Sequence, residues 1–162
     1  MTFQNIVKKL GGILIKVFFI YLLLISFNLF SQQEQPIHEI HEIHEEKFSN
    51  NNLKYQVTYI NGIKHGKEIF WYESGIKKIE SHFINGKENG LWQQWYENGQ
   101  TKLRVVYING KENGLWQQWY ENGQIRSFVK FINGKKDGEE VYFNRDGSTT
   151  STDLYTNGKI LK

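Results

Sequence analysis

Three histidines spaced three residues apart are the side chains of this chain best suited to metal chemistry. His38, His41 and His44 lie in the acidic stretch HEIHEIHEE. In a helix, residues three apart share a face, so these imidazoles could be offered to one metal ion. The segment is short, however, and neither a Cys nor a second cluster of ligands accompanies it. We therefore predict no metal cofactor, and any site built on these histidines would be loose and exchangeable.

The other reactive side chains do not form a catalytic set. The chain has no Cys, and its Ser, His and acidic residues are not spaced in a way that suggests a triad. His65 is expected in a turn, and His82 in a strand beside Glu80, which is typical of a solvated strand face. The glycines open turns rather than helices, so we see no phosphate-binding loop. The sequence predicts a protein that is not an enzyme and that uses no cofactor.

Aromatic and amide side chains are better candidates, because they can bind a macromolecule. Two segments share a pattern in which Trp, Gln and Tyr occupy every second position of an expected strand. Alternation places them on the face opposite to the intervening Trp95 or Trp119. Trp and Tyr are enriched in interface hot spots, and their rings also stack on sugars. We predict a binding strip, with packing inside the fold as the open alternative, formed by Trp92, Gln94, Tyr96, Trp116, Gln118 and Tyr120.

These candidate residues belong to a sequence repeat. Residues 84–100 read INGKENGLWQQWYENGQ, and residues 108–124 read the same seventeen letters, an offset of 24. A fixed period of this size indicates a repeat protein whose small units stack along an axis. Nine of the fifteen Gly follow an Asn, and Asn-Gly is the strongest short-range hairpin signal. The sequence predicts an all-β fold, an elongated single-layer antiparallel sheet of tandem 24-residue hairpins.

Alignment of the units identifies the columns expected to form the core. One aromatic column lies two residues before the Asn-Gly pair that opens each unit, and the other lies nine residues after the Gly of that pair. We expect both to form one buried spine, with the members Tyr59, Phe83, Tyr107 and Phe131 in the first column and Trp71, Trp95, Trp119 and Phe143 in the second. A further inward column holds Val57, Ser81, Val105 and Val129. The polar residues from about 148 onward are expected to cap the array.

The first 31 residues have the features of an export signal. Lys8 and Lys9 precede an unbroken apolar run over 17–25, and Ser31 is a small residue near the end of the apolar segment. We expect a signal peptide over 1–31 that is cleaved after Ser31, so that the mature chain is secreted or enters the periplasm or envelope. An uncleaved membrane anchor over 13–30 is the alternative. Both interpretations place the rest of the chain outside the cytoplasm.

Residues 32–52 are polar and acidic, a composition typical of a disordered linker. The repeat array is expected to follow over 53–162. This array is mildly basic but lacks the dense Lys and Arg clusters of a nucleic-acid binder. We therefore expect no nucleic-acid partner, and contact with a membrane only through the N-terminal segment.

The repeat has the pattern Tyr/Phe-x-Asn-Gly-Lys-x-x-Gly-x-x-x-x-Trp-Tyr-x-x-Gly, which resembles the MORN repeat in its bacterial variant form. The resemblance covers residues 53–162. It implies hairpins laid side by side in an elongated sheet, and a scaffold for proteins or membranes. Bacterial variants of the family are often labelled antitoxin-like. An antitoxin that meets a cytoplasmic toxin would not carry an export signal, so this chain departs from that label.

Together these features predict an exported, non-enzymatic repeat module that binds a protein partner through the aromatic strip, as a scaffold or antitoxin-like protein. The alternatives are a module that binds a carbohydrate or envelope polymer, and a membrane-associated scaffold. Gln94 and Gln118 suit a sugar as well as they suit a protein, because amides beside an aromatic ring occur in both kinds of site.

Overall fold

The computed structural model describes residues 16, 20–25 and 39–161, in two units, Met1–His38 and Glu39–Lys162. In the first unit, residues 16 and 20–25 are helical. Among the described residues, no helix is long and apolar enough to cross a membrane. Cleavage after Ser31 and most of the segment 1–31 lie outside the described residues, as does His38. Export therefore stays a prediction.

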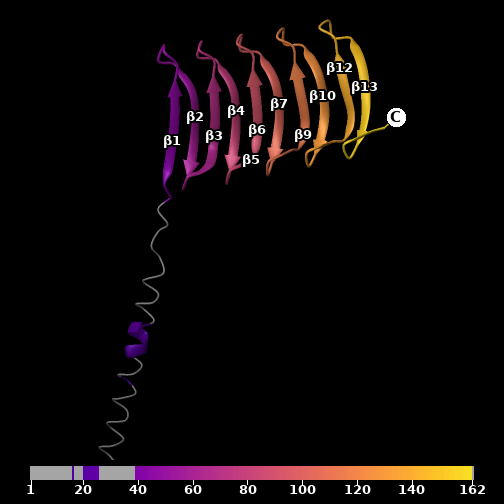
Figure 1. The fold of residues 1–162 in the computed structure, drawn as a ribbon. Coiled ribbons are helices and arrows are strands. Elements are labelled where there is room, and N and C mark those ends of the chain that lie inside the picture. Colours follow the sequence, from indigo (N-terminus) through magenta and orange to yellow (C-terminus); the bar gives the residue numbers. More distant parts are fainter. Residues whose placement is uncertain (1–15, 17–19, 26–38, 162) are drawn as a thin grey trace, which may run out of the picture. The chain divides into compact units, whose positions relative to one another are not determined.

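The second unit is a single antiparallel sheet that runs as a meander from hairpin to hairpin (Figure 1). Its main strands lie in the order β1-β2-β3-β4-β6-β7-β9-β10-β12-β13-β14, and the short β5, β8 and β11 pair with β4, β7 and β10. The bounds are β1 His41–Lys47, β2 Leu53–Ile60, β3 Ile63–Trp71, β4 Lys77–Ile84, β5 Lys87–Glu88, β6 Gly90–Trp95, β7 Thr101–Ile108, β8 Lys111–Glu112, β9 Gly114–Trp119, β10 Ile125–Ile132, β11 Lys135–Lys136, β12 Gly138–Phe143, β13 Thr149–Thr156 and β14 Lys159–Leu161. The predicted sheet of tandem hairpins is confirmed.

The Asn-Gly pair of each repeat forms the tight turn at one end of the strands. In all five turns the Asn has a φ of 50° or 51°, and the following Gly has a φ between 74° and 81°. Two successive residues with positive φ define the type I′ turn, whose twist matches that of the flanking strands. The turns lie at Asn61-Gly62, Asn85-Gly86, Asn109-Gly110, Asn133-Gly134 and Asn157-Gly158. The repeated dipeptide therefore sets the path of the whole meander.

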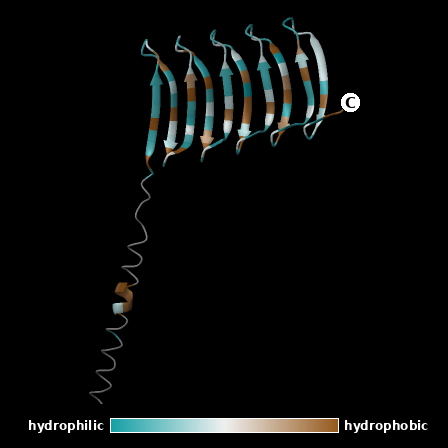
Figure 2. Ribbon diagram, viewed as in Figure 1, coloured by the Kyte–Doolittle hydropathy of each residue, from teal (hydrophilic) through white to brown (hydrophobic). Residues whose placement is uncertain are grey.

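Strand pairing divides the side chains between two faces of the sheet, because cross-strand partners share a face and neighbours along a strand do not. One face, which we call the valine face, carries Val57, Val105 and Val129, each only 1% exposed. Ser81, at the equivalent position of the repeat that follows Val57, is 2% exposed. The other side of the sheet is called the opposite face. Bands of apolar and polar residues follow one another along the strands in Figure 2.

The expectation that the two aromatic columns form one spine is wrong. Tyr107 pairs with Gly90, which places it with Trp92 on the valine face, whereas Trp95 points to the opposite face. The Phe143 ring likewise lies 6.0 Å from the ring of Phe128, on that opposite face. Members of both columns are half-buried, and the fully buried column is that of the valines. Alternation determines which residues of one strand share a face. Only the register across the turn determines which residues of the next strand lie on that same face.

The prediction of a disordered linker over 32–52 is wrong for its second half. Residues 41–47 form β1, which pairs with β2 from His41↔Ile60 to Lys47↔Leu53. All seven residues of β1 are exposed, and most are hydrophilic in Figure 2. The unpaired backbone groups of β2 provide a template that this polar sequence completes without burying a core. A charged edge strand of this kind discourages pairing with a second sheet.

Candidate binding face

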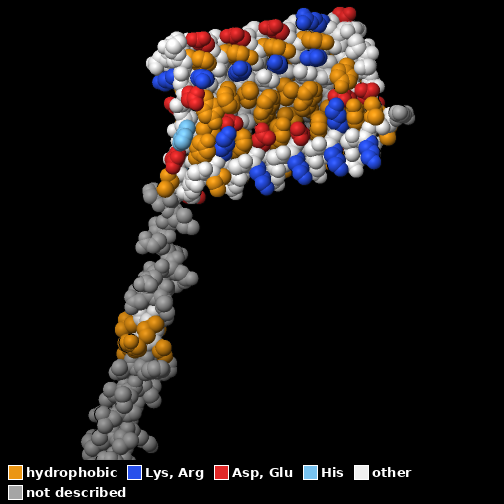
Figure 3. Space-filling model, viewed as in Figure 1, with side chains coloured by type: hydrophobic (Ala, Val, Ile, Leu, Met, Phe, Trp, Pro, Cys, Tyr) orange, Lys and Arg blue, Asp and Glu red, His pale blue; other side chains and the backbone are white. Residues whose placement is uncertain are grey.

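Trp92 and Trp116 lie on the valine face near the middle of the array. Trp92 in β6 is the cross-strand partner of Val105, and Trp116 in β9 is that of Val129. Both indoles are half-buried, while the two valines are almost fully shielded from solvent. Each ring therefore helps to bury the core and still keeps part of its surface open to solvent. Figure 3 shows apolar side chains gathered in a band that crosses the repeats.

Gln94 and Gln118 share this face, as alternation predicts. Both are cross-strand partners of Leu103 in β7, one from each side, and both are half-buried. Trp92, Gln94, Trp116 and Gln118 are called the tryptophan strip below. Within it, two adjacent repeats present the same ring and the same amide, so a ligand that spans both repeats meets the pattern twice.

Tyr96 and Tyr120 make a structural contact that we did not predict from the sequence. Each lies just past the end of its strand and donates its hydroxyl to a backbone carbonyl of the next repeat, Tyr96 to Trp119 O and Tyr120 to Phe143 O, both at 2.8 Å. Tyr72 does the same with Trp95 O at 2.9 Å. The three tyrosines therefore tie successive hairpins together, and we leave Tyr96 and Tyr120 out of the tryptophan strip. Alignment of Tyr72 with them was the signal for this role.

Buried ion pairs flank the tryptophan strip on both sides. Glu68 and Glu140 occupy the repeat position of Trp92 and Trp116, and they are only 9% and 4% exposed. Each carboxylate is 2.5 Å from the ammonium of the lysine four residues earlier, Lys64 or Lys136. Glu68 also accepts hydrogen bonds from Tyr55 Oη at 2.8 Å and Ser81 Oγ at 3.4 Å. These partners compensate for the cost of burying the charge.

The charges near the strip shift the titration of neighbouring groups. Burial raises the pKa of Glu88, and the negative charges of Glu112 and Glu68 raise it further. Burial together with Glu112 and Glu88 raises the pKa of Tyr107 to about 12. Burial and a hydrogen bond to Glu140 raise the pKa of Tyr142 to about 12. Glu88 and Glu112 thus make the valine face locally acidic in the two central repeats.

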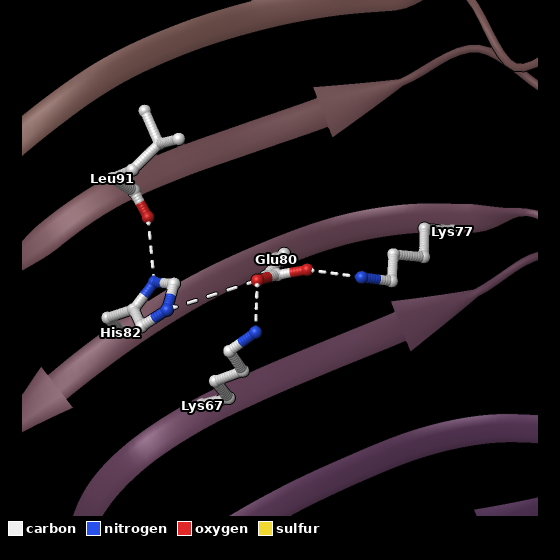
Figure 4. Close-up of polar contacts among 5 residues, drawn as sticks. All are labelled: Lys67, Lys77, Glu80, His82 and Leu91. Atoms are coloured by element: carbon white, nitrogen blue, oxygen red, sulfur yellow. Dashed lines mark hydrogen bonds and ion pairs between the residues drawn. The ribbon is translucent and has the colours of Figure 1, made fainter.

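The opposite face carries a polar cluster around Glu80 (Figure 4). Lys77 Nζ lies 2.5 Å and Lys67 Nζ 3.0 Å from the carboxylate, and His82 Nε2 is 3.9 Å away. Burial alone would raise the pKa of Glu80, but the two lysines outweigh it and lower the pKa. His82 Nδ1 is 3.1 Å from Leu91 O, so His82 bridges β4 and β6. The geometry is that of an ion-pair network rather than of a proton-transfer site.

The structure separates the two described histidines of the candidate metal motif. The segment is a strand and not a helix, so a spacing of three places His41 and His44 on opposite faces of the sheet. The His44 ring instead packs 5.0 Å from that of Tyr59. Within residues 16, 20–25 and 39–161, no three His, Cys, Asp or Glu side chains are grouped as metal ligands.

A shallow hollow of about 240 Å³ lies on the opposite face between two repeats. Its lining combines polar groups with an indole, from Gln93, Gln100, Thr101, Arg104, Trp119 and Gly123. Arg104 is the cross-strand partner of Gln93 on one side and of Gln117 on the other, so a guanidinium stands between two amides. The sequence prediction of a binding strip did not include this hollow.

Comparison with known proteins gives the family of the repeat. The family described as MORN repeat variant matches three successive segments, residues 64–85, 88–109 and 112–133. No curated protein matches the chain. MORN repeats are non-catalytic modules that bind proteins or membranes. The matched segments include the hairpins that carry the tryptophan strip and the Lys64–Glu68 ion pair, and the repeats over residues 64–133 are MORN repeats of the variant type.

Proposed function

We propose that this chain is an exported scaffold module that binds a protein partner through the valine face, with the tryptophan strip at the centre of the contact. One observation carries the proposal. Two adjacent repeats present half-buried Trp92 and Trp116 where both flanking repeats bury a glutamate paired with a lysine. Trp is enriched at interface hot spots, and such residues lie near the centre of an interface, surrounded by contacts that are close to neutral in energy.

The position of the contact can be tested with a photo-activatable cross-linking residue. We would place it at Gln94, on the valine face, or at its neighbour Gln93, on the opposite face, in the full-length chain. The proposal expects an envelope or secreted protein to be cross-linked from Gln94 and not from Gln93. Cross-linking from Gln93 alone would move the contact to the other side of the sheet.

The role of the indoles needs a second variant. The double substitution Trp92→Ser and Trp116→Ser should abolish cross-linking of the partner protein from position 94. The double substitution Val106→Ser and Leu115→Ser should preserve this cross-linking. Val106 and Leu115 are 38% and 46% exposed and lie on the opposite face, so they match the change without touching the strip. Circular dichroism would show whether both variants fold. A folded tryptophan variant that still captures the protein would contradict the proposal.

An envelope glycan is the second candidate ligand. It is favoured by the amides beside the indoles, both in the tryptophan strip and in the hollow that Arg104 and Trp119 line. Retention on isolated envelope polysaccharide measures this directly. A glycan bound in the hollow would be lost in Trp119→Ser and kept in Trp92→Ser with Trp116→Ser, whereas a glycan on the strip would give the reverse pattern.

Export is supported by the two lysines and the apolar run of the N-terminal sequence. We expect the mature protein to begin at Gln32 and to be recovered with the envelope or the medium. Cell fractionation followed by N-terminal sequencing measures both. A chain that keeps its first residue and fractionates with membranes would support the anchor instead.

A further inference from the structure

A row of alternating rings and charges crosses the valine face beside the tryptophan strip. Each charged residue is the cross-strand partner of an aromatic one, in the pairs Tyr59↔Lys64, Phe83↔Glu88, Tyr107↔Glu112 and Phe131↔Lys136. The charged members are called the charged row: Lys64, Glu88, Glu112 and Lys136. Its sign changes from positive to negative and back along the array, although the four residues occupy the same position of the repeat.

The two flanking repeats show what this position holds when it is filled from within. The ammonium of Lys64 lies 5.0 Å from the centre of the Phe83 ring and 2.5 Å from Glu68. The ammonium of Lys136 lies 4.9 Å from the centre of the Tyr155 ring and 2.5 Å from Glu140. In both repeats a cation therefore rests on an aromatic face beside a carboxylate, a geometry that stabilises the charge in two ways.

The two central repeats keep the ring and remove the cation. Glu88 and Glu112 replace the lysines, and Trp92 and Trp116 replace the paired glutamates. Tyr107 lies between the two carboxylates, since it is the cross-strand partner of Glu112 and the charge of Glu88 also raises the pKa of its hydroxyl. The only contact of Glu112 with a hydrogen-bond donor among the described side chains is Tyr107 Oη, at 3.5 Å. Negative charge thus accumulates at the repeat position where the flanking repeats place an ammonium group.

Building on the proposed function, we propose that the protein partner inserts basic side chains, Lys or Arg, onto the central part of the charged row. The cation contacts Glu88 and Glu112 over the Tyr107 ring, and the adjacent Trp92 and Trp116 receive the apolar stem of the basic side chain. The partner supplies to the central repeats the charge that Lys64 and Lys136 supply internally to the flanking ones.

Charge complementarity and ring geometry favour this occupant over a bare metal ion. Rings beside a carboxylate bind ammonium and guanidinium groups, whereas hard metal ions require several oxygen ligands. The described residues contain no group of three metal ligands. Burial and mutual repulsion already disfavour ionised Glu88, so an incoming cation relieves a cost that the free protein carries.

Spacing defines the arrangement of the basic residues. Consecutive repeats are two strands apart, about 9.6 Å at the usual distance between strands. A polyproline II segment has three residues per turn, so its residues i and i+3 lie on the same side, about 9.3 Å apart. A segment in this conformation that follows the array axis therefore meets Glu88 and Glu112 with every third side chain. We expect the partner to carry Lys or Arg at that interval.

The test uses the full-length chain and fluorescein-labelled nonapeptides with Arg at every third position and Ser and Leu between. Matched peptides carry Gln or Glu in place of Arg. Fluorescence polarisation should show binding of the Arg peptide, at least tenfold weaker binding of the Gln peptide, and none of the Glu peptide. Equal binding of the Arg and Gln peptides, or no binding of the Arg peptide, would overturn the proposal.

The repeats themselves provide a variant that should fold. Glu88→Lys with Trp92→Glu, and Glu112→Lys with Trp116→Glu, install the internal pair of the flanking repeats. We expect each double substitution to weaken binding of the Arg peptide at least tenfold. Glu139→Gln, an exposed residue of the opposite face, changes the net charge by the same amount and should have no effect. Equal weakening by Glu139→Gln would show that only overall charge matters, which contradicts a defined site.

Failure of this inference can be separated from failure of the proposed function. Glu88→Gln with Glu112→Gln removes the charges and keeps both indoles. If this variant still yields the protein cross-linked from Gln94, the partner binds the tryptophan strip without a basic group, and only the present inference fails. If no protein is cross-linked from position 94 in the chain that keeps Glu88 and Glu112, the proposed function itself fails.

Discussion

One position of the repeat changes the chemistry of the valine face from unit to unit. It reads Glu68, Trp92, Trp116 and Glu140 along the array. The residue four positions earlier changes with it, from lysine beside each glutamate to glutamate beside each tryptophan. A buried carboxylate needs an ion-pair partner, whereas an indole does not, so the two positions are chemically coupled. The backbone stays the same along the array, while the side chains at these two positions change from a buried Lys–Glu ion pair to a half-buried Trp beside a Glu.

At the residue scale, Glu88→Gln should stabilise the protein near neutral pH. The folded pKa of Glu88 lies above its unfolded value, so its charge opposes folding at neutral pH. This cost disappears once the pH falls below the unfolded pKa, where both states are protonated. We expect Glu88→Gln to raise the melting temperature at pH 7 and to have little effect near pH 4. Thermal unfolding followed by circular dichroism at both pH values measures this.

Glu97→Gln is the control for that prediction, because Glu97 lies exposed in a turn of the same repeat unit. It should leave the melting temperature nearly unchanged at either pH. A stabilisation by Glu88→Gln that persists undiminished at pH 4 would mean that the amide itself, and not the loss of charge, is responsible.

Tyr96→Phe should destabilise the protein although it keeps the ring. The substitution removes the hydroxyl that donates to Trp119 O at 2.8 Å and leaves that carbonyl without this partner. A lost hydrogen bond of this kind costs about 1 kcal/mol. Chemical denaturation should show the loss, and Tyr59→Phe provides the comparison. A Tyr96→Phe protein as stable as the original would remove the case for a tie between repeats.

At the scale of elements, sequence reasoning succeeded where one strand or one turn determines the result. The Asn-Gly turns, the strand pattern and the buried valine column follow from local alternation and from positive φ. It failed where two strands must be related. The pairing shifts register between Gln94 and Trp95, so the faces of β6 and β7 could not be matched by counting residues. β1 was missed because its composition is polar and only the edge of β2 makes it a strand.

The same distinction applies to the candidate site. Alternation placed Trp92 and Gln94 together, because both belong to one strand. It also grouped Tyr96 with them, although this residue lies past the strand end and bonds to the next repeat. The charged row was visible in the aligned sequence, where lysine and glutamate exchange in step with glutamate and tryptophan. Its meaning required the register that brings Glu112 beside Tyr107.

The turns allow a prediction at this scale. Gly110 has a φ of 77°, and an added Cβ would meet no atom within 4 Å. Gly110→Ala should therefore cost only the conformational strain of a left-handed alanine, about 1–2 kcal/mol. Urea unfolding would measure it, with Lys111→Ala at the next exposed position as the reference. A loss much larger than 2 kcal/mol would show that the turn has contacts that the structure does not contain.

At the scale of the whole array, each hairpin packs mainly on its two neighbours, so stability should grow with the number of units. Deletion of residues 85–108 removes one unit and joins Ile84 to Asn109, which restores the repeat pattern. We expect this shorter chain to fold with the same type of circular dichroism spectrum and a lower melting temperature. Deletion of 85–107 removes one residue fewer and should not fold properly, because a shift of one residue exchanges the two faces of every later strand.

This view of the array would be contradicted if the deletions of 85–108 and of 85–107 had the same effect on folding. If the chain lacking 85–107 folds as well as the chain lacking 85–108, the register is not fixed by the burial of the valine column. If neither folds, the unit is not modular, and the stability of the sheet depends on contacts between distant repeats.

The identity of residues 84–100 and 108–124 also has a consequence for how this protein can change. Coding segments for identical units can recombine out of step, and each such event would insert or delete one complete hairpin without disturbing the reading of the others. Every inserted copy would lengthen the valine face by one indole and one carboxylate. A lineage could therefore change the length of this face in whole steps, by gene duplication alone, before any new amino acid had to be selected.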